Sequence, residues 1–266
     1  MGSLDSERVG EYFATRDTVA GWWTPDEGPL AFHYDAEIEV LDDQLEFDPD
    51  WQVLDVGTGR GRFGAHFASR GCRVIGVDLN PDMIEVAREA ARLRGVAERF
   101  DVRSGNAEHL TEFEDGRFDV VLCMELFDHL PDLSAALAEA RRVLRPGGRF
   151  LFTYVPSESI YGALGNVYRR VVARRKPGEL MISRTYALSE VRALLSSAGL
   201  SLEAHWGIGV LCVNAQTRLF GDNLIVRMLL AIARAEARVR SYHGTPWLAR
   251  RGAHVVGVAR PKETAA

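Results

Sequence analysis

The residues best suited to bind a ligand form a glycine-rich stretch from Val53 to Gly64, with the sequence VLDVGTGRGRFG. Its apolar start is typical of a buried parallel strand. Glycine lets the backbone turn sharply and lets a ligand come close, because it has no Cβ. The segment from Phe63 to Ala68 then predicts a helix, whose first N–H groups are free to meet an anionic group. The sequence therefore predicts a ligand-binding loop at the carboxyl end of a first strand.

Two ligand classes compete for this loop. Gly59, Gly61 and Gly64 fit G-x-G-x-x-G, the dinucleotide pattern, but that pattern should begin as the strand ends, and here it starts later. Asp55 begins a different pattern, acidic-x-Gly-x-Gly-x-Gly, which ends at Gly61. A carboxylate repels a pyrophosphate but attracts a ligand with a free ammonium group. The second pattern is therefore favoured, and a tight turn without any ligand is the weakest alternative.

A second acidic residue, Asp78, ends the next expected strand, Cys72–Asp78, about 20 residues after the glycines. A carboxylate at this place can accept hydrogen bonds from both hydroxyls of a ribose, although it can also be a helix-terminus carboxylate without a ligand. Asn80-Pro81 predicts the start of a helix. The strand expected at Phe100–Ser104 is followed by Asn106, whose amide suits either an adenine edge or a simple turn.

The elements that position these residues alternate between buried strands and helices, which predicts an α/β fold with a doubly wound parallel sheet. Further strands are expected at 117–123 and 149–155, with a helix at 132–144 between them. A helix at 186–198 precedes two last strands, at 200–206 and 253–260.

The composition is that of an ordinary globular protein, with 266 residues, of which 47% are hydrophobic and 26% charged. A net charge of −5 argues against nucleic-acid binding, which needs a basic face. Cys72, Cys123 and Cys212 are far apart, so neither a zinc site nor a disulfide framework is expected. Without a signal-peptide pattern or an apolar run of about 18 residues, the chain is expected to be cytoplasmic.

Five segments resemble, in order and spacing, the motifs of class I S-adenosylmethionine-dependent methyltransferases, closest to the small-molecule enzymes of quinone and natural-product biosynthesis. They are Asp55–Gly61, Val74–Pro81, Ser104–Ala107, Phe118–Val121 with Leu130–Asp132, and Val143–Phe150. The resemblance covers about residues 50 to 155. It implies S-adenosylmethionine as the cofactor and a mostly parallel seven-stranded sheet that ends in an antiparallel hairpin, with strand seven inserted between strands five and six.

The resemblance also implies a role for individual residues. The methionine part of the cofactor would lie against Asp55, Gly57, Thr58, Gly59 and Gly61. Its ribose would contact Asp78, and its sulfonium would face the backbone of Cys123. Its adenine would contact Leu79, Met83, Asn106 and Ala107. Family members often carry Asp where this chain has Asn106, which keeps the acceptor and loses the charge, so we expect binding of a different strength.

The expected reaction is methyl transfer to a small, apolar or aromatic molecule, with oxygen favoured over carbon or nitrogen as the acceptor atom. A hydroxyl acceptor benefits from a general base, for which His129 and His33 are the candidates, whereas an acidic phenol needs none. His129 can equally be a structural residue. No clear cluster of metal ligands is evident, so no metal is expected. Alternatives are a lipid or isoprenoid-quinone methyltransferase at the membrane surface and a catalytically silent cofactor-binding subunit.

The domain organisation follows from the same motifs. Residues 1–48 are expected to form an N-terminal helical lid, or else a helical packing layer, before a methyltransferase domain at 49–266. Two cap insertions are expected at about 156–185, with a basic run near Arg174, and at about 214–244. The predicted substrate contacts are Trp22, Trp23, Tyr34 and Tyr161. Expected partners are a small-molecule acceptor and at most a peripheral membrane contact, for a monomer or homodimer.

The second insertion carries an apolar stripe at helical spacing. It consists of Leu224, Ile225, Met228, Leu229 and Ile232, with arginines mostly off it. Three interpretations stay open: a cap over an apolar substrate pocket, a helix resting on an anionic membrane, and an amphipathic helix packed on the domain.

Overall fold

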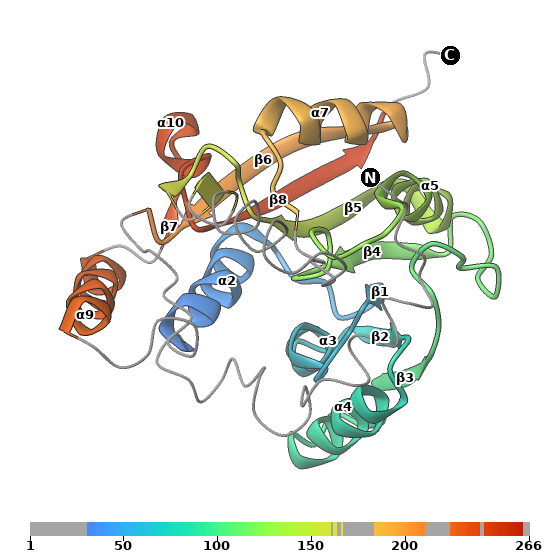
Figure 1. Ribbon diagram of the computed structural model, residues 1–266. Helices are drawn as coiled ribbons and strands as arrows, with labels where there is room; N and C mark the ends of the chain where they lie inside the picture. The colour runs from blue at the N-terminus through green and yellow to red at the C-terminus, as the bar shows by residue number, and fades with distance from the viewer. Residues whose placement is uncertain are drawn as a thin grey trace, which may run out of the picture.

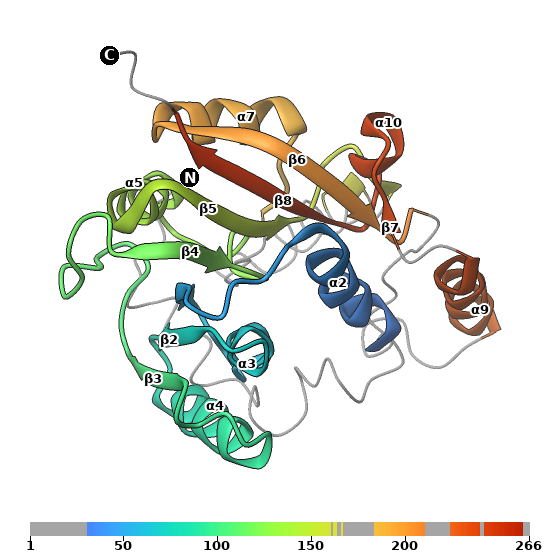
Figure 2. The ribbon, with the colours of Figure 1, turned by 180° about the vertical axis from the view of Figure 1, so that it is seen from behind.

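The computed structural model describes residues 31–160, 184–210, 224–239 and 242–262, together with positions 162, 163 and 166. In these ranges the strands form one sheet with the order β3-β2-β1-β4-β5-β8-β6-β7 (Figures 1 and 2). The strands are β1 (Gln52–Val56), β2 (Arg73–Asp78), β3 (Phe100–Ser104), β4 (Phe118–Cys123), β5 (Leu144–Tyr154), β6 (Leu200–Ile208), β7 (Tyr242–His243) and β8 (His254–Pro261). The α/β fold predicted from the sequence is confirmed.

Helices cover both faces of the sheet. They are α2 (Ala31–Gln44), α3 (Arg62–Ser69), α4 (Pro81–Leu93), α5 (Leu133–Val143), α7 (Leu188–Ser197), α9 (Leu224–Val239) and α10 (Pro246–Ala249). One hydrophobic core joins α2, α3 and α4 to one face, and a second joins α5 and α7 to the other. All six residues of β4 are buried, because a parallel strand between two helical layers has no solvent face.

Local signals in the sequence set several of the boundaries. The side chain of Asn80 accepts hydrogen bonds from the backbone N–H groups of Asp82 and Met83, so it caps α4 as predicted. Asp132 caps α5 in the same way by accepting from the N–H of Ala135. These two caps fix where the helices begin after β2 and β4, and hence which residues lie in the loops at the carboxyl edge of the sheet.

The end of the sheet is antiparallel, as the family resemblance implies. β8 lies between β5 and β6 and runs antiparallel to both. The prediction of seven strands is wrong by one, because Tyr242 and His243 add a short strand, β7, beside β6. This strand is two residues long, too short for hydrophobic periodicity to reveal it.

The N-terminal segment is in part a packing layer. Within α2, Ala36, Val40 and Leu41 are buried in the core that also holds α3 and α4. A lid that includes residues 31–44 would therefore have to break core contacts. Trp22 and Trp23 lie outside the described residues, so the lid itself stays a prediction.

The second insertion forms α9, which lies beside α2 in both views (Figures 1 and 2). Among the described side chains of α9, Leu230 and Ala233 are buried, and Ala233 packs with Phe32 of α2. Of the predicted stripe, Leu224, Met228 and Ile232 are exposed, Leu229 is half-buried, and the side chain of Ile225 lies outside the described residues. A search of the described residues finds no helix long and apolar enough to cross a membrane.

Candidate active site

The glycine loop predicted from the sequence connects β1 to α3. Gly57, Gly59 and Gly61 have φ angles of 66°, 52° and 75°, a region that side chains disfavour. A Cβ at Gly57 would lie 2.6 Å from the side chain of Leu126, so packing also requires glycine there. A Cβ at Gly59 would meet no atom nearer than 3.9 Å. The backbone at Gly59 therefore faces a space that a ligand can enter.

Two carboxylates, the buried Asp55 and the partly buried Asp78, hold this loop in place. Asp55 Oδ2 accepts hydrogen bonds from the Thr58 hydroxyl at 2.6 Å and from the N–H of Gly64 at 3.1 Å. Asp78 Oδ2 accepts from the N–H of Gly59 at 2.8 Å, and its Oδ1 accepts from the N–H of Asn80 at 2.9 Å. Each carboxylate oxygen has two lone pairs, so Asp78 can still accept hydrogen bonds from a ligand.

Burial dominates the electrostatics of both groups. It raises the pKa of Asp55 to about 7, against the opposing effects of the Thr58 hydroxyl and the Gly64 N–H. Burial also raises the pKa of Asp78, which the backbone N–H groups of Asn80 and Gly59 lower in part. A cationic ligand group beside these carboxylates would stabilise their charged forms.

The predicted adenine contacts surround the end of β2 and the loop after β3. Leu79 is 42% exposed, although it is apolar, and Met83 is buried behind it in the first turn of α4. Asn106 Oδ1 accepts a hydrogen bond from the N–H of Glu108, which gives Asn106 the turn role considered above. Ala107 is buried in the same turn. An adenine contact of Asn106 stays a prediction.

On the other side of the loop, β4 ends at the buried Cys123. His129 follows in the turn after β4 and is partly buried, with its backbone N–H donating to the carbonyl of Leu126. His33 belongs to α2, but its side chain lies outside the described residues, as does Tyr161. The proton-transfer roles of His129 and His33 stay predictions.

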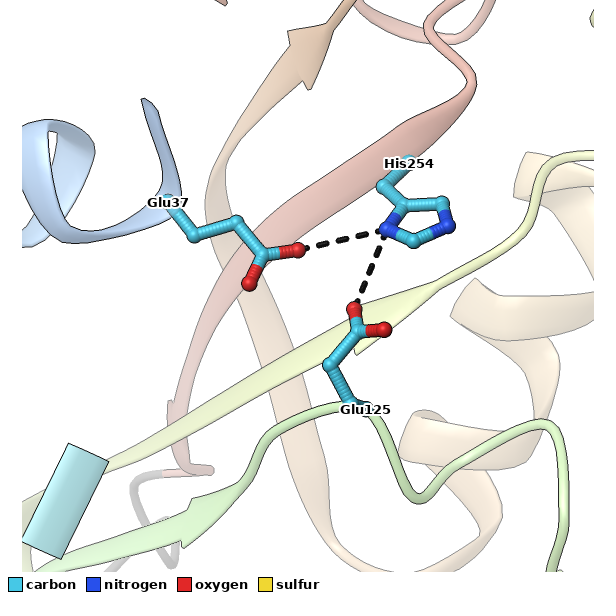
Figure 3. A group of neighbouring side chains, drawn as sticks. All are labelled: Glu37, Glu125 and His254. Atoms are coloured by element: carbon cyan, nitrogen blue, oxygen red, sulfur yellow. Dashed lines mark hydrogen bonds and ion pairs between the residues drawn. The ribbon is translucent and has the colours of Figure 1, made fainter. Parts of the chain in front are cut away.

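Three titratable side chains from distant parts of the chain meet beside the carboxyl ends of β4 and β5 (Figure 3). They are Glu37 from α2, Glu125 from the turn after β4 and His254 from the start of β8. His254 Nδ1 lies 3.2 Å from Glu37 Oε1 and 3.1 Å from Glu125 Oε1. Glu37 is 0% exposed, and the ring of Tyr34 stands edge-on to the ring of His254 at 6.2 Å. We call these three residues the Glu37–Glu125–His254 cluster.

Hydrogen bonds to Thr153 of β5 fix the position of Glu125 in the cluster. The N–H of Glu125 donates to Thr153 Oγ1 at 2.6 Å, and the Thr153 hydroxyl donates to Glu125 Oε1 at 3.2 Å. Burial, reinforced by the charge of Glu125, raises the pKa of Glu37 to about 8. Burial lowers the pKa of His254, but the two carboxylates more than offset this effect and hold that pKa well above its usual value.

Comparison with known proteins identifies the family. A family model described as a methyltransferase domain matches residues 54–152. A ubiquinone biosynthesis O-methyltransferase of Xanthomonas euvesicatoria pv. vesicatoria is 32% identical over 185 residues, which are 68% of this chain and 76% of that protein. The chain belongs to the class I S-adenosylmethionine-dependent methyltransferases. Methyltransferase GfsG of Streptomyces halstedii is 31% identical over 237 residues, 83% of this chain and 80% of that protein.

A solved structure gives the same fold for this methyltransferase. It is a Thermotoga maritima S-adenosylmethionine-dependent methyltransferase, described as a possible histamine N-methyltransferase, with a TM-score of 0.65 and 21% identity. The match covers 96% of this chain and all of that one. The family model and the ubiquinone O-methyltransferases confirm the predicted family, enzyme class and cofactor, and the dinucleotide alternative is set aside.

The cofactor of this methyltransferase is S-adenosylmethionine, and the described residues fit it. The space beside Gly59 and the acceptor capacity of Asp78 suit its amino-acid and ribose parts, and the exposed Leu79 suits an apolar ring. When bound, the cofactor supplies a methyl group activated by a sulfonium charge. The individual contacts remain predictions, because they follow from the family resemblance.

The sequence did not reveal the Glu37–Glu125–His254 cluster, because 217 residues separate Glu37 from His254. One signal was available. The apolar spacing of α2 puts Glu37 on the same helix face as Val40 and Leu41, and an acidic residue on a buried face needs a reason. The structure brings together three residues of metal-ligand type that formed no clear cluster in the sequence, and the expectation that no metal is needed is not tested by this geometry.

Proposed function

We propose that this methyltransferase transfers the methyl group of S-adenosylmethionine to an oxygen atom of a small, apolar or aromatic molecule. The position of the Glu37–Glu125–His254 cluster carries the proposal. Glu125 comes two residues after Cys123, where the family resemblance puts the sulfonium, so the cluster lies on the acceptor side of the crevice. A hydroxyl must lose a proton when its oxygen is methylated, and a buried carboxylate–imidazole group can promote that loss.

The names of relatives support oxygen as the acceptor atom. Two ubiquinone biosynthesis O-methyltransferases, from Xanthomonas and Hahella, match 76% and 85% of their own lengths to this chain. The reaction requires the acceptor oxygen to lie about 3 Å from the methyl carbon and in line with the bond that breaks. We assign this positioning to the turn after β4 and to Tyr34, whose ring is buried beside the cluster.

The exposed stripe on α9 favours a second candidate, in which a lipid or isoprenoid quinone is methylated at a membrane surface. Leu224, Met228 and Ile232 are exposed at four-residue spacing, so they share one side of the helix. The exposed Arg234 and Arg238 flank that side. An apolar stripe with flanking arginines suits a helix that lies on an anionic membrane.

A cytoplasmic location and a monomeric or homodimeric state stay predictions.

One assay separates the two candidates. The full chain is incubated with methyl-labelled S-adenosylmethionine and a panel of phenols, catechols, amines and carbon nucleophiles, with and without anionic vesicles. Transfer to hydroxyl acceptors in plain buffer supports the first proposal. Transfer that requires vesicles supports the second. Transfer only to nitrogen or carbon would contradict both oxygen-acceptor proposals.

A further inference from the structure

We propose that Glu37, Glu125 and His254 form a binding site for a divalent transition-metal cation of the Zn²⁺ or Mn²⁺ type. The site lies on the acceptor side of the crevice, but the proposal concerns metal binding alone. It can therefore fail or succeed independently of the acceptor that the enzyme methylates.

The geometry of the three donor atoms fits one cation. One ligand atom from each residue lies within 4.8 Å of the other two, and His254 Nδ1 lies 3.2 and 3.1 Å from the two Oε1 atoms. Adjacent ligands of an octahedral ion with bonds of about 2.1 Å are about 3.0 Å apart. Two carboxylate oxygens and one imidazole nitrogen also form a donor set typical of Zn²⁺, Mn²⁺ and Fe²⁺.

A second observation points to a missing ligand. Glu37 is 0% exposed, and its Oε2 atom is buried without a hydrogen-bond partner. A buried carboxyl oxygen without a partner is unfavourable, because it has lost its contact with water and gained no hydrogen bond in return. His254 Nδ1 can carry one hydrogen, which two carboxylates would have to share. A cation at this point would bind both glutamates, and Glu37 would satisfy its Oε2 by binding through both oxygens.

Two other histidine–carboxylate pairs lack these features. His66 lies 2.8 Å from Asp42, but Arg70 also pairs with that carboxylate and supplies a positive charge. His243 lies 3.0 Å from Glu236, a single carboxylate that also accepts a hydrogen bond from a backbone N–H. The Glu37–Glu125–His254 cluster differs from both by its second carboxylate and by the partnerless oxygen of Glu37.

The bonding environment of Glu125 suits a fixed ligand. Its φ angle is 55°, unusual for a residue with a side chain. Its N–H and Oε1 are both hydrogen-bonded to Thr153 Oγ1. Such an outer-shell partner orients a metal-binding carboxylate and strengthens its affinity. The three ligands come from α2, from the turn after β4 and from β8, so a bound cation would also fasten α2 to the sheet.

The test measures metal binding by the full chain without cofactor or acceptor. Chelator-treated protein is titrated with Zn²⁺ and, separately, with Mn²⁺ by calorimetry, and its melting temperature is recorded with and without each metal. We expect one ion per chain and a rise in melting temperature, since a ligand that binds only the native state stabilises it. Glu37→Gln should weaken binding at least about tenfold.

Glu236→Gln is the matched control, because it changes a Glu–His pair that lacks a second carboxylate. It should leave the metal affinity unchanged. Wild-type protein that binds neither metal, or equal affinities of wild type and Glu37→Gln, would overturn the proposal. His254→Gln, which removes the imidazole ligand, is the second variant: if Glu37→Gln fails to fold, equal affinities of wild type and His254→Gln would overturn the proposal.

Discussion

At the carboxyl edge of the sheet, the proposed cofactor site and the proposed acceptor site differ in how far apart their residues lie along the chain. On the cofactor side, the glycine loop and Asp78 lie within 30 residues of each other along the chain, at the ends of β1 and β2. On the proposed acceptor side, the Glu37–Glu125–His254 cluster joins residues as far apart as 217 positions. The proposed cofactor contacts are thus encoded locally, whereas the proposed acceptor site depends on how the whole chain folds.

The largest expected effect concerns the cofactor side. Asp78→Ala should weaken S-adenosylmethionine binding by roughly 2 to 4 kcal/mol, because the variant loses charged hydrogen bonds to the ribose and the support of the Gly59 N–H. Calorimetric titration measures the affinity. Asp78→Asn, which keeps the shape, should lose less. Unchanged affinity in Asp78→Ala would show that the ribose is held elsewhere.

The next largest effect is expected on the free energy of unfolding, when a side chain is added to the glycine loop. Gly57→Ala should lower the free energy of unfolding by about 2 to 3 kcal/mol, because φ is 66° and Leu126 would have to move. Gly95→Ala is the matched control, since its φ is 69° but a Cβ there would meet nothing within 4 Å. It should cost only about 1 kcal/mol. Equal losses in urea unfolding would contradict the close packing of the loop.

Asp55 predicts a pH dependence on the cofactor side. Its pKa is about 7 in the folded protein and 3.8 as the ordinary value, so folding takes up a proton between these pH values. The stability that Asp55 contributes is thus present below about pH 4 and is lost as the pH rises through 7. Asp55→Asn does not titrate. Unfolding curves from pH 5 to 8 should show the wild type losing stability relative to the variant, and parallel curves would refute this.

The smallest effect is expected on the exposed face of α9. Ile232→Asp should reduce binding to anionic vesicles, measured by co-sedimentation, if this face meets membranes, because a charge would enter the apolar stripe. Cofactor affinity should not change, since α9 lies apart from the glycine loop (Figure 1). Leu93→Asp, which puts the same charge on an exposed apolar side chain of α4, is the control. Vesicle binding that both variants retain would argue against a membrane role for α9.

The sequence predicts the features of this enzyme that depend on local patterns, and it misses those that depend on contacts between distant residues. The cap at Asn80, the glycine loop and the last strand's place between β5 and β6 are confirmed, because each depends on a local pattern or on the family motifs. The two-residue β7 was missed, since it has no periodicity of its own. In α9, periodicity identified an apolar stripe but not its neighbours, and the chain instead buries Leu230 and Ala233. The acceptor-side cluster needs three-dimensional contacts that no spacing reveals.

The proposed separation of a cofactor side from an acceptor side is tested most directly by two measurements on Glu37→Gln. The first is its affinity for S-adenosylmethionine by calorimetry. The second is its rate of methyl transfer to a hydroxyl acceptor that the wild type uses. We predict an affinity within about twofold of the wild type and a transfer rate reduced at least about tenfold. Loss of cofactor affinity together with transfer would contradict the account, because Glu37 would then belong to the cofactor side. An unchanged transfer rate would equally contradict it.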